Sequence, residues 1–425
     1  MSALDTPPAD AADPVTPVAP ADPVDPAAPV DPAGGPARRR LRLRTSVEEE
    51  GRATSPLELF FDLVFAVGMA ELVAVLLHRP DWVGAARFAA LFVPVWWTWV
   101  CYTFYADRFD NDDRLYRLVM IVAMTAALGL AVMVPGAFAD GAGAVRFALG
   151  YLLVRLILIG LYLRAHHHAP EARPLTRRYL QGFAAGAVCW GLAALLPPPL
   201  CYGLWALGLG LEMATPLVSA TAIGRVPFNR SHIPERFGLF TIIVLGEVVA
   251  LNAAGIATSH LRPAALATVF GSLLVGAAQW WLCFDFVDDT PLRQWRLTGQ
   301  VYVYGHLVVH AGIAATGVGG LLATEAANSA GAGSAWRPVL CLGIAAFLFG
   351  IGAIHLVNVR PPGDLRAWSR IGLGGLLALL ALAGPPLPPI GLEAVLLVCL
   401  AAQITVEDKV PDVHTILARS GGTHG

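Results

Sequence analysis

The sequence predicts an all-α protein, a polytopic membrane bundle of about twelve transmembrane helices in two parallel six-helix repeats. Its composition supports a membrane protein, because 56% of the 425 residues are hydrophobic and only 14% are charged, against roughly 25% charged in soluble domains. Apolar runs follow one another along the chain, and each has about the 20 residues that a helix needs to cross a bilayer. Polar and aromatic landmarks that recur in the second half indicate the repeats.

The first 53 residues differ in composition from the rest of the chain. Residues 1–37 consist mainly of Pro, Ala, Asp and Val, and this composition cannot bury a core. An arginine cluster between Arg38 and Arg44 follows. Directly before a transmembrane helix, such a cluster is typical of an anchor on anionic lipid and not of nucleic-acid binding. We therefore expect a disordered cytoplasmic tail over 1–53 and no nucleic-acid partner.

Apolar runs separated by Gly, Pro and charged residues place six spans in each half. The first repeat, 54–224, is expected to hold spans near 57–78, 82–105, 115–135, 144–164, 179–197 and 199–222. The second repeat, 225–407, is expected to hold spans near 236–256, 263–287, 299–324, 338–357, 370–385 and 388–405. The last two spans are short and interrupted by Gly and Pro, and a short cytoplasmic tail, 408–425, follows them.

The distribution of basic residues predicts the orientation of these spans. When the N-terminus is placed in the cytoplasm, the basic residues gather in the cytoplasmic loops, as the positive-inside rule requires. The few in the loops on the other side are Arg79, Arg87, Arg146, Arg262 and Arg337. We therefore expect a multi-pass protein with both termini in the cytoplasm.

Three landmarks recur in the same order in the two halves. The matching segments are 58–60 with 235–237, 96–107 with 280–288, and 116–119 with 304–308. Because six spans is an even number, both copies enter the membrane from the same side, and the repeat is parallel. Transporters built on such halves place a site between them near the midplane. The Trp-rich segments around residues 96–99 and 280–281 are expected to be packed helix ends.

Ionisable residues within the predicted spans are the candidate functional residues, because a charge at bilayer depth is costly without a partner or water. Glu58 and Asp62 are four residues apart, which places them on one face of the first helix. Glu71 lies roughly 20 Å further along that helix than Glu58. The seventh span repeats this pattern, since Glu235 lies at its start.

One further base and one further acid are candidates on the seventh span. Arg236 follows Glu235, and Glu247 lies about 18 Å deeper. An acid at a helix start is also ordinary, because the helix dipole favours it there. Deeper acids can instead pair with hydroxyl or basic partners, but such contacts in membranes are often worth only about 1 kcal/mol. The pattern therefore favours a functional role for the deeper carboxylates.

The remaining polar candidates lie on other spans. Arg155 is the one basic residue that the assignment of charges to the two sides leaves in the interior of a span, and Glu212 in the sixth span is its expected partner; the pair either balances charge in a pathway or is purely structural. His306 and His310 share a face of the ninth span. Because histidine titrates near neutral pH, they could form a proton relay with the deeper carboxylates, or make ordinary helix contacts.

Known catalytic motifs do not accompany these residues in the sequence. The HExxH, P-loop, GxSxG and dinucleotide-binding patterns are absent. The six cysteines are scattered singly without CxxC spacing, so the sequence indicates neither a metal site nor disulfides. We expect no enzymatic activity, no cofactor and no metal.

Two blocks of sequence resemble the two hallmarks of the bacterial low temperature requirement A family. They are Glu58-Leu59-Phe60-Phe61-Asp62-Leu63-Val64-Phe65, and Glu235-Arg236-Phe237-Gly238 through Leu245-Gly246-Glu247. The resemblance extends from about residue 54 to about residue 407, and it implies a bacterial inner-membrane protein linked by name to growth in the cold, with no settled substrate. The first block is also similar to the first helix of potassium channels that carry a Phe-Ser-Asp signature, although Phe60-Phe61 replaces Phe-Ser.

These observations predict a transporter or channel for a small ion or solute, with carboxylates that bind a cation or carry protons. The alternative is a non-transporting membrane factor that assists assembly, signalling or lipid adaptation in the cold, in which the acids join helices. The expected partners are the lipid bilayer and a small ion or solute, and the sequence is compatible with a homo-oligomer. The candidate pathway residues are Glu58, Asp62, Glu71, Arg155, Glu212, Glu235, Arg236, Glu247, His306 and His310.

Overall fold

The computed structural model separates into two units, residues 1–39 and 40–425. It describes residues 42–43, 54–110, 113–219, 223, 232–286, 297–328, 335–358, 364–385 and 387–409. All of these belong to the second unit. The expected tails, 1–53 and 408–425, lie outside the described residues, apart from Arg42–Leu43 and residues 408–409. Arg42–Leu43 (β1) pairs antiparallel with Phe109–Asp110 (β2), which directly follows a helix.

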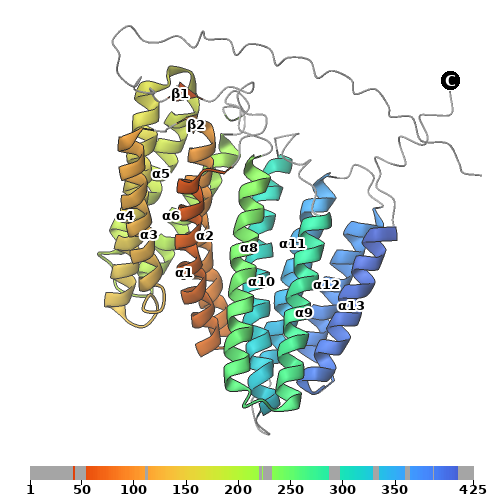
Figure 1. Ribbon diagram of the computed structural model, residues 1–425. Coiled ribbons are helices and arrows are strands. Elements are labelled where there is room, and N and C mark those ends of the chain that lie inside the picture. The colour runs from red at the N-terminus through yellow and green to blue at the C-terminus, as the bar shows by residue number, and fades with distance from the viewer. Residues whose placement is uncertain are drawn as a thin grey trace, which may run out of the picture. The chain divides into compact units, whose positions relative to one another are not determined.

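Twelve long α-helices make up the described part of the chain (Figure 1). Those of the first half are α1 (Pro56–His78), α2 (Trp82–Arg108), α3 (Arg114–Met133), α4 (Gly141–His168), α5 (Arg173–Ala193) and α6 (Leu200–Val218), with a short 3-10 helix, η2 (Pro170–Ala172), before α5. Those of the second half are α8 (His232–Thr258), α9 (Pro263–Phe286), α10 (Leu297–Asn328), α11 (Trp336–Asn358), α12 (Leu365–Ala383) and α13 (Pro389–Lys409). The prediction of an all-α bundle is confirmed.

Eleven of these helices are long and apolar enough to cross a membrane, and α5 is the exception among the described residues. It begins at Arg173, six residues before the predicted span, and Arg177 and Arg178 follow in its second turn. These charges lower its mean hydropathy, although its C-terminal part is apolar. The protein is therefore a multi-pass membrane protein, and the sequence prediction of twelve spans matches twelve helices.

Side-chain caps fix where several helices begin. The Ser55 hydroxyl accepts a hydrogen bond from the backbone N–H of Glu58, while the Glu58 carboxylate accepts from the Ser55 N–H at 2.8 Å, so α1 starts with a capping box. Asp81, Asp113 and Asp140 cap α2, α3 and α4 by accepting a backbone N–H of the first turn. Because these caps lie between apolar runs, each run becomes a separate helix.

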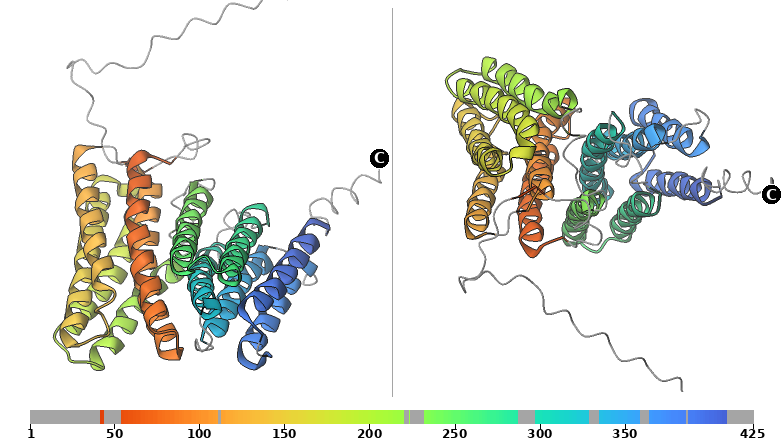
Figure 2. Two further views of the ribbon diagram at one scale, coloured as in Figure 1. Left: turned by 60° about the horizontal axis from the view of Figure 1, so that its bottom comes forward. Right: turned by 90° about the horizontal axis from the view of Figure 1, so that it is seen from above.

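The two halves of the chain contain matching helix contacts. Helix α1 packs on α2 and α3, as α8 packs on α9 and α10, and the pairs α3–α4 and α4–α5 correspond to α10–α11 and α11–α12. A duplicated six-helix unit would produce this pattern, and the repeat itself stays a prediction. The halves meet where α1 and α2 contact α8 and α10 (Figure 2).

The Trp-rich segments differ between the halves. Trp96, Trp97 and Trp99 are buried on α2, as predicted. Trp280 and Trp281 on α9 are 47% and 48% exposed, so the prediction of a packed helix end is wrong for this second pair. The reason is that this face of α9 points away from its neighbouring helices, where an indole can meet lipid instead of protein.

Candidate functional site

A cluster of five ionisable side chains joins α1, α2 and α8 at the contact between the halves. We call it the acidic cluster, and it consists of Glu58 and Asp62 on α1, Asp107 on α2, and His232 and Arg236 on α8. None of the five is more than 4% exposed. Burial of this kind removes the hydration of each charge, so each needs a partner within the protein.

Asp62 is the centre of this cluster. Arg236 Nη2 donates to Asp62 Oδ1 at 2.5 Å, and the indole Nε1 of Trp99 donates to the same oxygen at 2.7 Å. The other oxygen, Oδ2, is buried and accepts no hydrogen bond. Arg236 also lies near Glu58, with 3.6 Å between Nη1 and Oε1. One Asp62 oxygen therefore accepts two hydrogen bonds, while the other accepts none.

His232 lies between the two remaining carboxylates. Its Nδ1 is 3.0 Å from Asp107 Oδ1, and its Nε2 is 3.7 Å from Glu58 Oε2. Within the described residues, His232 therefore links the carboxylate of α1 to that of α2.

The local sequence explains this arrangement. Glu58 and Asp62 are one helical turn apart on α1, and His232 and Arg236 are one turn apart on α8, so each helix presents a short row of charges to the other. Glu235 does not join the cluster, because it points to the other side of α8. It is exposed, and its carboxylate accepts hydrogen bonds from the backbone N–H and hydroxyl of Thr54 at 3.3 and 2.8 Å.

A second polar contact lies further along α2, α8 and α10. Trp96 Nε1 donates to His310 Nδ1 at 2.9 Å, and His310 Nε2 lies 2.9 Å from the hydroxyl of Thr241. Because an indole N–H can only donate, Nδ1 carries no proton, and His310 is neutral with its proton on Nε2. A proton relay through His310 would require Trp96 to move away first.

His306, one turn earlier on α10, makes a different contact. Its Nδ1 bonds to the backbone oxygen of Tyr302 at 2.8 Å, and its ring packs 5.0 Å from that of Phe237. The rings of His306 and His310 lie 5.6 Å apart, so the predicted shared face is seen. No direct hydrogen bond joins the two histidines within the described residues.

Arg155 and Glu212 form the ion pair that the sequence predicted, on α4 and α6. Arg155 Nε lies 2.9 Å from Glu212 Oε2, and both side chains are fully buried. The Tyr151 hydroxyl donates to the same carboxylate oxygen at 2.7 Å and accepts from Arg155 Nη2 at 2.5 Å. This pair shares no residue with the acidic cluster, so the structure divides the predicted site residues between two places.

Glu71 and Glu247 belong to neither place. Both are partly buried, and within the described part of the chain neither makes a hydrogen bond or an ion pair. The sequence analysis also missed two members of the acidic cluster, Asp107 and His232, which lie in the end turns of their helices. Asp107 is the last residue of the Trp-rich segment 96–107 on α2, and this position in the sequence could have indicated it as a candidate.

An apolar cavity of about 670 Å³ lies between α1, α2, α10 and α11. Asp81 contributes a charged group to its lining, and the rest is almost entirely apolar. Phe92 in this lining is one turn from Trp96 on α2, and Ala311 follows His310 on α10, but neither Trp96 nor His310 lines the cavity. As for metals, no group of three or more His, Cys, Asp or Glu among the described residues is arranged to hold an ion.

The helices and their buried charges define a polytopic α-helical membrane protein. The family model described as bacterial low temperature requirement A protein (LtrA) matches residues 53–405. The chain belongs to this family, so the resemblance is confirmed. It is also similar to a protein of Rhizobium meliloti (strain 1021) named "Uncharacterized protein RA0937", with 30% identity over 296 residues, 65% of this chain and 71% of that one. No solved structure matches the chain.

Proposed function

We propose that this protein transports a small ion or solute, and that the acidic cluster takes up a proton or a monovalent cation. The observation that carries the proposal is the open oxygen of Asp62, whose Oδ2 is buried at the contact between the halves and accepts no hydrogen bond. In a cluster that served only to join helices, both oxygens of a buried carboxylate would be expected to have partners, because buried polar groups are normally satisfied. Ionisable groups of this kind within membrane helices mark ion and proton pathways.

Asp62 is the acceptor that we propose for the proton or cation. Its Oδ2 accepts no hydrogen bond and is buried, while its Oδ1 holds Arg236 and Trp99. Protonation of Asp62 would weaken its ion pair with Arg236, which at 2.5 Å is the shortest of the ion pairs described above between α1 and α8. Since these helices belong to different halves, the charge of Asp62 would control how tightly the halves hold together, as alternating access requires.

The route that we propose follows α1, α2, α8 and α10. The acidic cluster lies at one end, and the Trp96–His310 contact separates it from the apolar cavity. That cavity, about 670 Å³, falls within the roughly 300–1,000 Å³ of small-molecule sites. Its apolar lining suits a solute with an apolar body, whose passage the acidic cluster would couple to a proton or cation.

The topology belongs to the same proposal. With both termini in the cytoplasm of a bacterial inner membrane, as the basic residues of the loops favour, the acidic cluster lies on the cytoplasmic side. Its partners are then the bilayer and the transported ion or solute, and no catalytic step or cofactor takes part. A link to growth in the cold, which the family name carries, would act through ion or solute balance.

Ion flux into proteoliposomes that hold the purified full-length protein tests this function. H⁺, K⁺ and Na⁺ would be measured separately for the wild type, for Asp62→Asn and for the control Glu235→Gln. Asp62→Asn removes the proposed acceptor, so we expect at least about a tenfold loss of flux at equal folded yield, the factor that about 1.4 kcal/mol produces. Glu235→Gln neutralises an exposed carboxylate next to Arg236 and should leave the flux unchanged.

Two results would contradict the proposal. The first is an ion flux through Asp62→Asn that equals the ion flux through the wild type. The second is a folded wild-type protein that moves none of the three ions, with Asp62→Asn lowering the folded yield only. That second pattern supports the alternative of a non-transporting membrane factor, in which the carboxylates join helices.

A further inference from the structure

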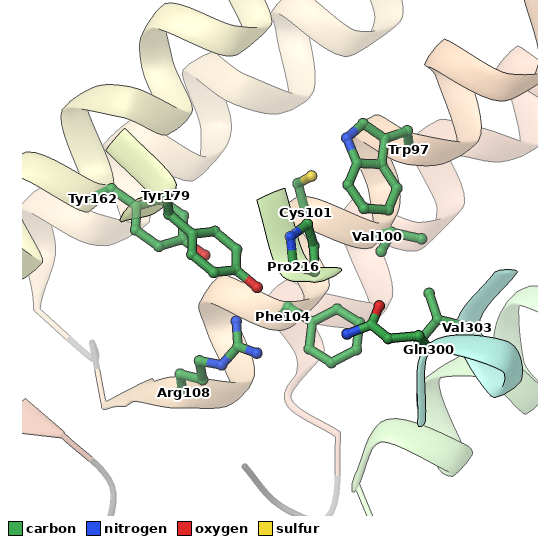
Figure 3. A pocket seen from close by; sticks show the side chains of 10 residues that line it. All are labelled: Trp97, Val100, Cys101, Phe104, Arg108, Tyr162, Tyr179, Pro216, Gln300 and Val303. Carbon is green, nitrogen blue, oxygen red and sulfur yellow. The ribbon is translucent and has the colours of Figure 1, made fainter. Parts of the chain in front are cut away.

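Arg108, the last residue of α2, is buried in a pocket that offers it no acid. It is 1% exposed, and its guanidinium lies among side chains of α2, α4, α5, α6 and α10 (Figure 3). Within the described residues, no acidic side chain lines this pocket. The neighbouring Asp107 contacts His232 of the acidic cluster at 3.0 Å. Asp107 also interacts electrostatically with Arg108, and Tyr179 forms a side-chain hydrogen bond with it, but no carboxylate of the described residues lies in the pocket itself.

The contacts of Arg108 with aromatic rings compensate it only in part. Its Cζ lies 5.2 Å from the ring centre of Phe104 and 5.4 Å from that of Tyr179. Cation–π contacts are worth about 2 kcal/mol when desolvated, whereas an unpaired buried charge costs several kcal/mol. Both Nε and Nη1 are buried without a hydrogen-bond partner. Two N–H donors are therefore free to bind a ligand.

Three more buried donors lie around the same pocket. The Tyr162 hydroxyl, Trp97 Nε1 and Gln300 Nε2 each have no hydrogen-bond partner, and the three side chains are 0%, 2% and 5% exposed. They come from α4, α2 and α10, and Figure 3 shows Tyr162 on the same side of the pocket as Arg108, with Trp97 and Gln300 on the other side. Buried donors are normally satisfied, so several orphans in one place indicate a missing acceptor.

A bound water does not fit this set of groups as well as an anion does. A water molecule could donate to the Tyr162 hydroxyl or to Gln300 Oε1, which also accept hydrogen bonds, but it would leave the charge of Arg108 unbalanced. An anion beside Arg108 accepts from its free N–H groups and neutralises its charge. With one arginine and no acid in the lining, the charge that completes the pocket is a single negative charge.

We propose that this pocket binds a monovalent anion of halide size. Its volume of about 20 Å³ has room for one particle near the size of a water molecule, which is too little for a phosphate or a carboxylate group. The ligand would connect α2, α4 and α5 of the first half with α10 of the second. Its binding would therefore stabilise the contact between the halves, and this inference does not depend on the transport function proposed above.

Thermal unfolding of the purified full-length protein in detergent tests the site. The protein would be titrated with sodium chloride or bromide against sodium gluconate at equal ionic strength. We expect both halides, and not the larger gluconate, to raise the unfolding temperature, because a ligand that binds only the folded state stabilises it. Arg108→Gln should abolish this effect, and the exposed-arginine control Arg79→Gln should retain it.

Tyr162→Phe keeps the inference testable where Arg108→Gln does not fold. It removes one hydroxyl donor and leaves the charge, so the halide concentration at half effect should rise about tenfold. Equal unfolding temperatures of the wild type in halide and gluconate would overturn the proposal. A halide effect that is the same in wild type and Tyr162→Phe would also overturn it, since a general salt effect would then explain the data.

Discussion

The ion pair of Arg155 and Glu212 permits a quantitative test of how this bundle is stabilised. The perturbation is Glu212→Gln, which keeps the size of the side chain and an oxygen acceptor but removes the negative charge. The wild-type distance from Arg155 Nε to Glu212 Oε2 is 2.9 Å, and both side chains are fully buried. The substitution therefore leaves a guanidinium in the bundle with no carboxylate in contact.

The magnitude follows from the surroundings of Arg155. Breaking a buried ion pair by removing one partner costs about 3–5 kcal/mol. The variant keeps part of the stabilisation of Arg155, because the Tyr151 hydroxyl still contacts Arg155. The ring centres of Tyr151 and Phe183 also lie 4.7 and 5.7 Å from the Cζ of Arg155. Cation–π contacts of this kind contribute about 1–2 kcal/mol. We expect Glu212→Gln to lower the free energy of unfolding by about 2–4 kcal/mol.

Reversible unfolding in mixed micelles, followed by tryptophan fluorescence, measures this loss. Trp190 is a local probe, since its ring lies 4.1 Å from that of Tyr151. The control is the double variant Arg155→Met with Glu212→Met, which removes both charges and should cost less than Glu212→Gln. The reasoning is refuted if Glu212→Gln costs under about 1 kcal/mol, the value of an ordinary membrane contact, or if the double variant is less stable. An unchanged ion flux in the double variant would indicate that the pair stabilises the fold and takes no part in transport.

Two further substitutions test neighbouring features. In Gly186→Ala, the new Cβ would lie 2.5 Å from Glu212 Oε1, so we expect a loss of roughly 1–3 kcal/mol in the same unfolding assay, whereas Gly210→Ala, with no atom within 4 Å, should not show this loss. Burial raises the pKa of Asp113, but the backbone N–H groups of α3 and Arg164 outweigh burial, and its pKa lies below the ordinary 3.8. A carboxylate with a lowered pKa stabilises the fold above its unfolded pKa, and this stability is lost as the pH falls through the folded pKa. Asn caps a helix about as well as Asp, so Asp113→Asn should cost only the partly exposed charge pair with Arg164, up to about 1 kcal/mol at neutral pH and progressively less below about pH 4; a cost independent of pH would contradict this.

The positions of the helices could be predicted because a span is a continuous apolar run with a cap or a charge at each end. The predicted 57–78 is α1, Pro56–His78, almost residue for residue. The start of α5 could not be found in this way. Its first two turns carry Arg173, Arg177 and Arg178, and a search for apolar runs does not detect a helix whose first turns are charged.

The same limit explains the unpredicted part of the acidic cluster. Glu58, Asp62 and Arg236 were candidates because they lie inside or beside apolar runs at helical spacing. Asp107 and His232 were not, because the predicted spans ended at 105 and began at 236, whereas α2 continues to Arg108 and α8 begins at His232. At either end of a predicted span, the boundary was placed before the flanking charged residues, so charged residues in an end turn are excluded even where tertiary contacts bury them.

The extra turn of α2 places Asp107 and Arg108 in different environments. Successive residues of a helix point about 100° apart, so Asp107 reaches His232 in the acidic cluster while Arg108 reaches the pocket beside Tyr162. The positive charge of Arg108 acts on the carboxylate of Asp107, and an anion in the pocket would weaken that effect. Arg108→Gln therefore changes the electrostatic potential at both sites, whereas Tyr162→Phe leaves every charge in place. For this reason, an effect of Tyr162→Phe can be assigned to anion binding alone, whereas an effect of Arg108→Gln can also come from the changed potential at the acidic cluster.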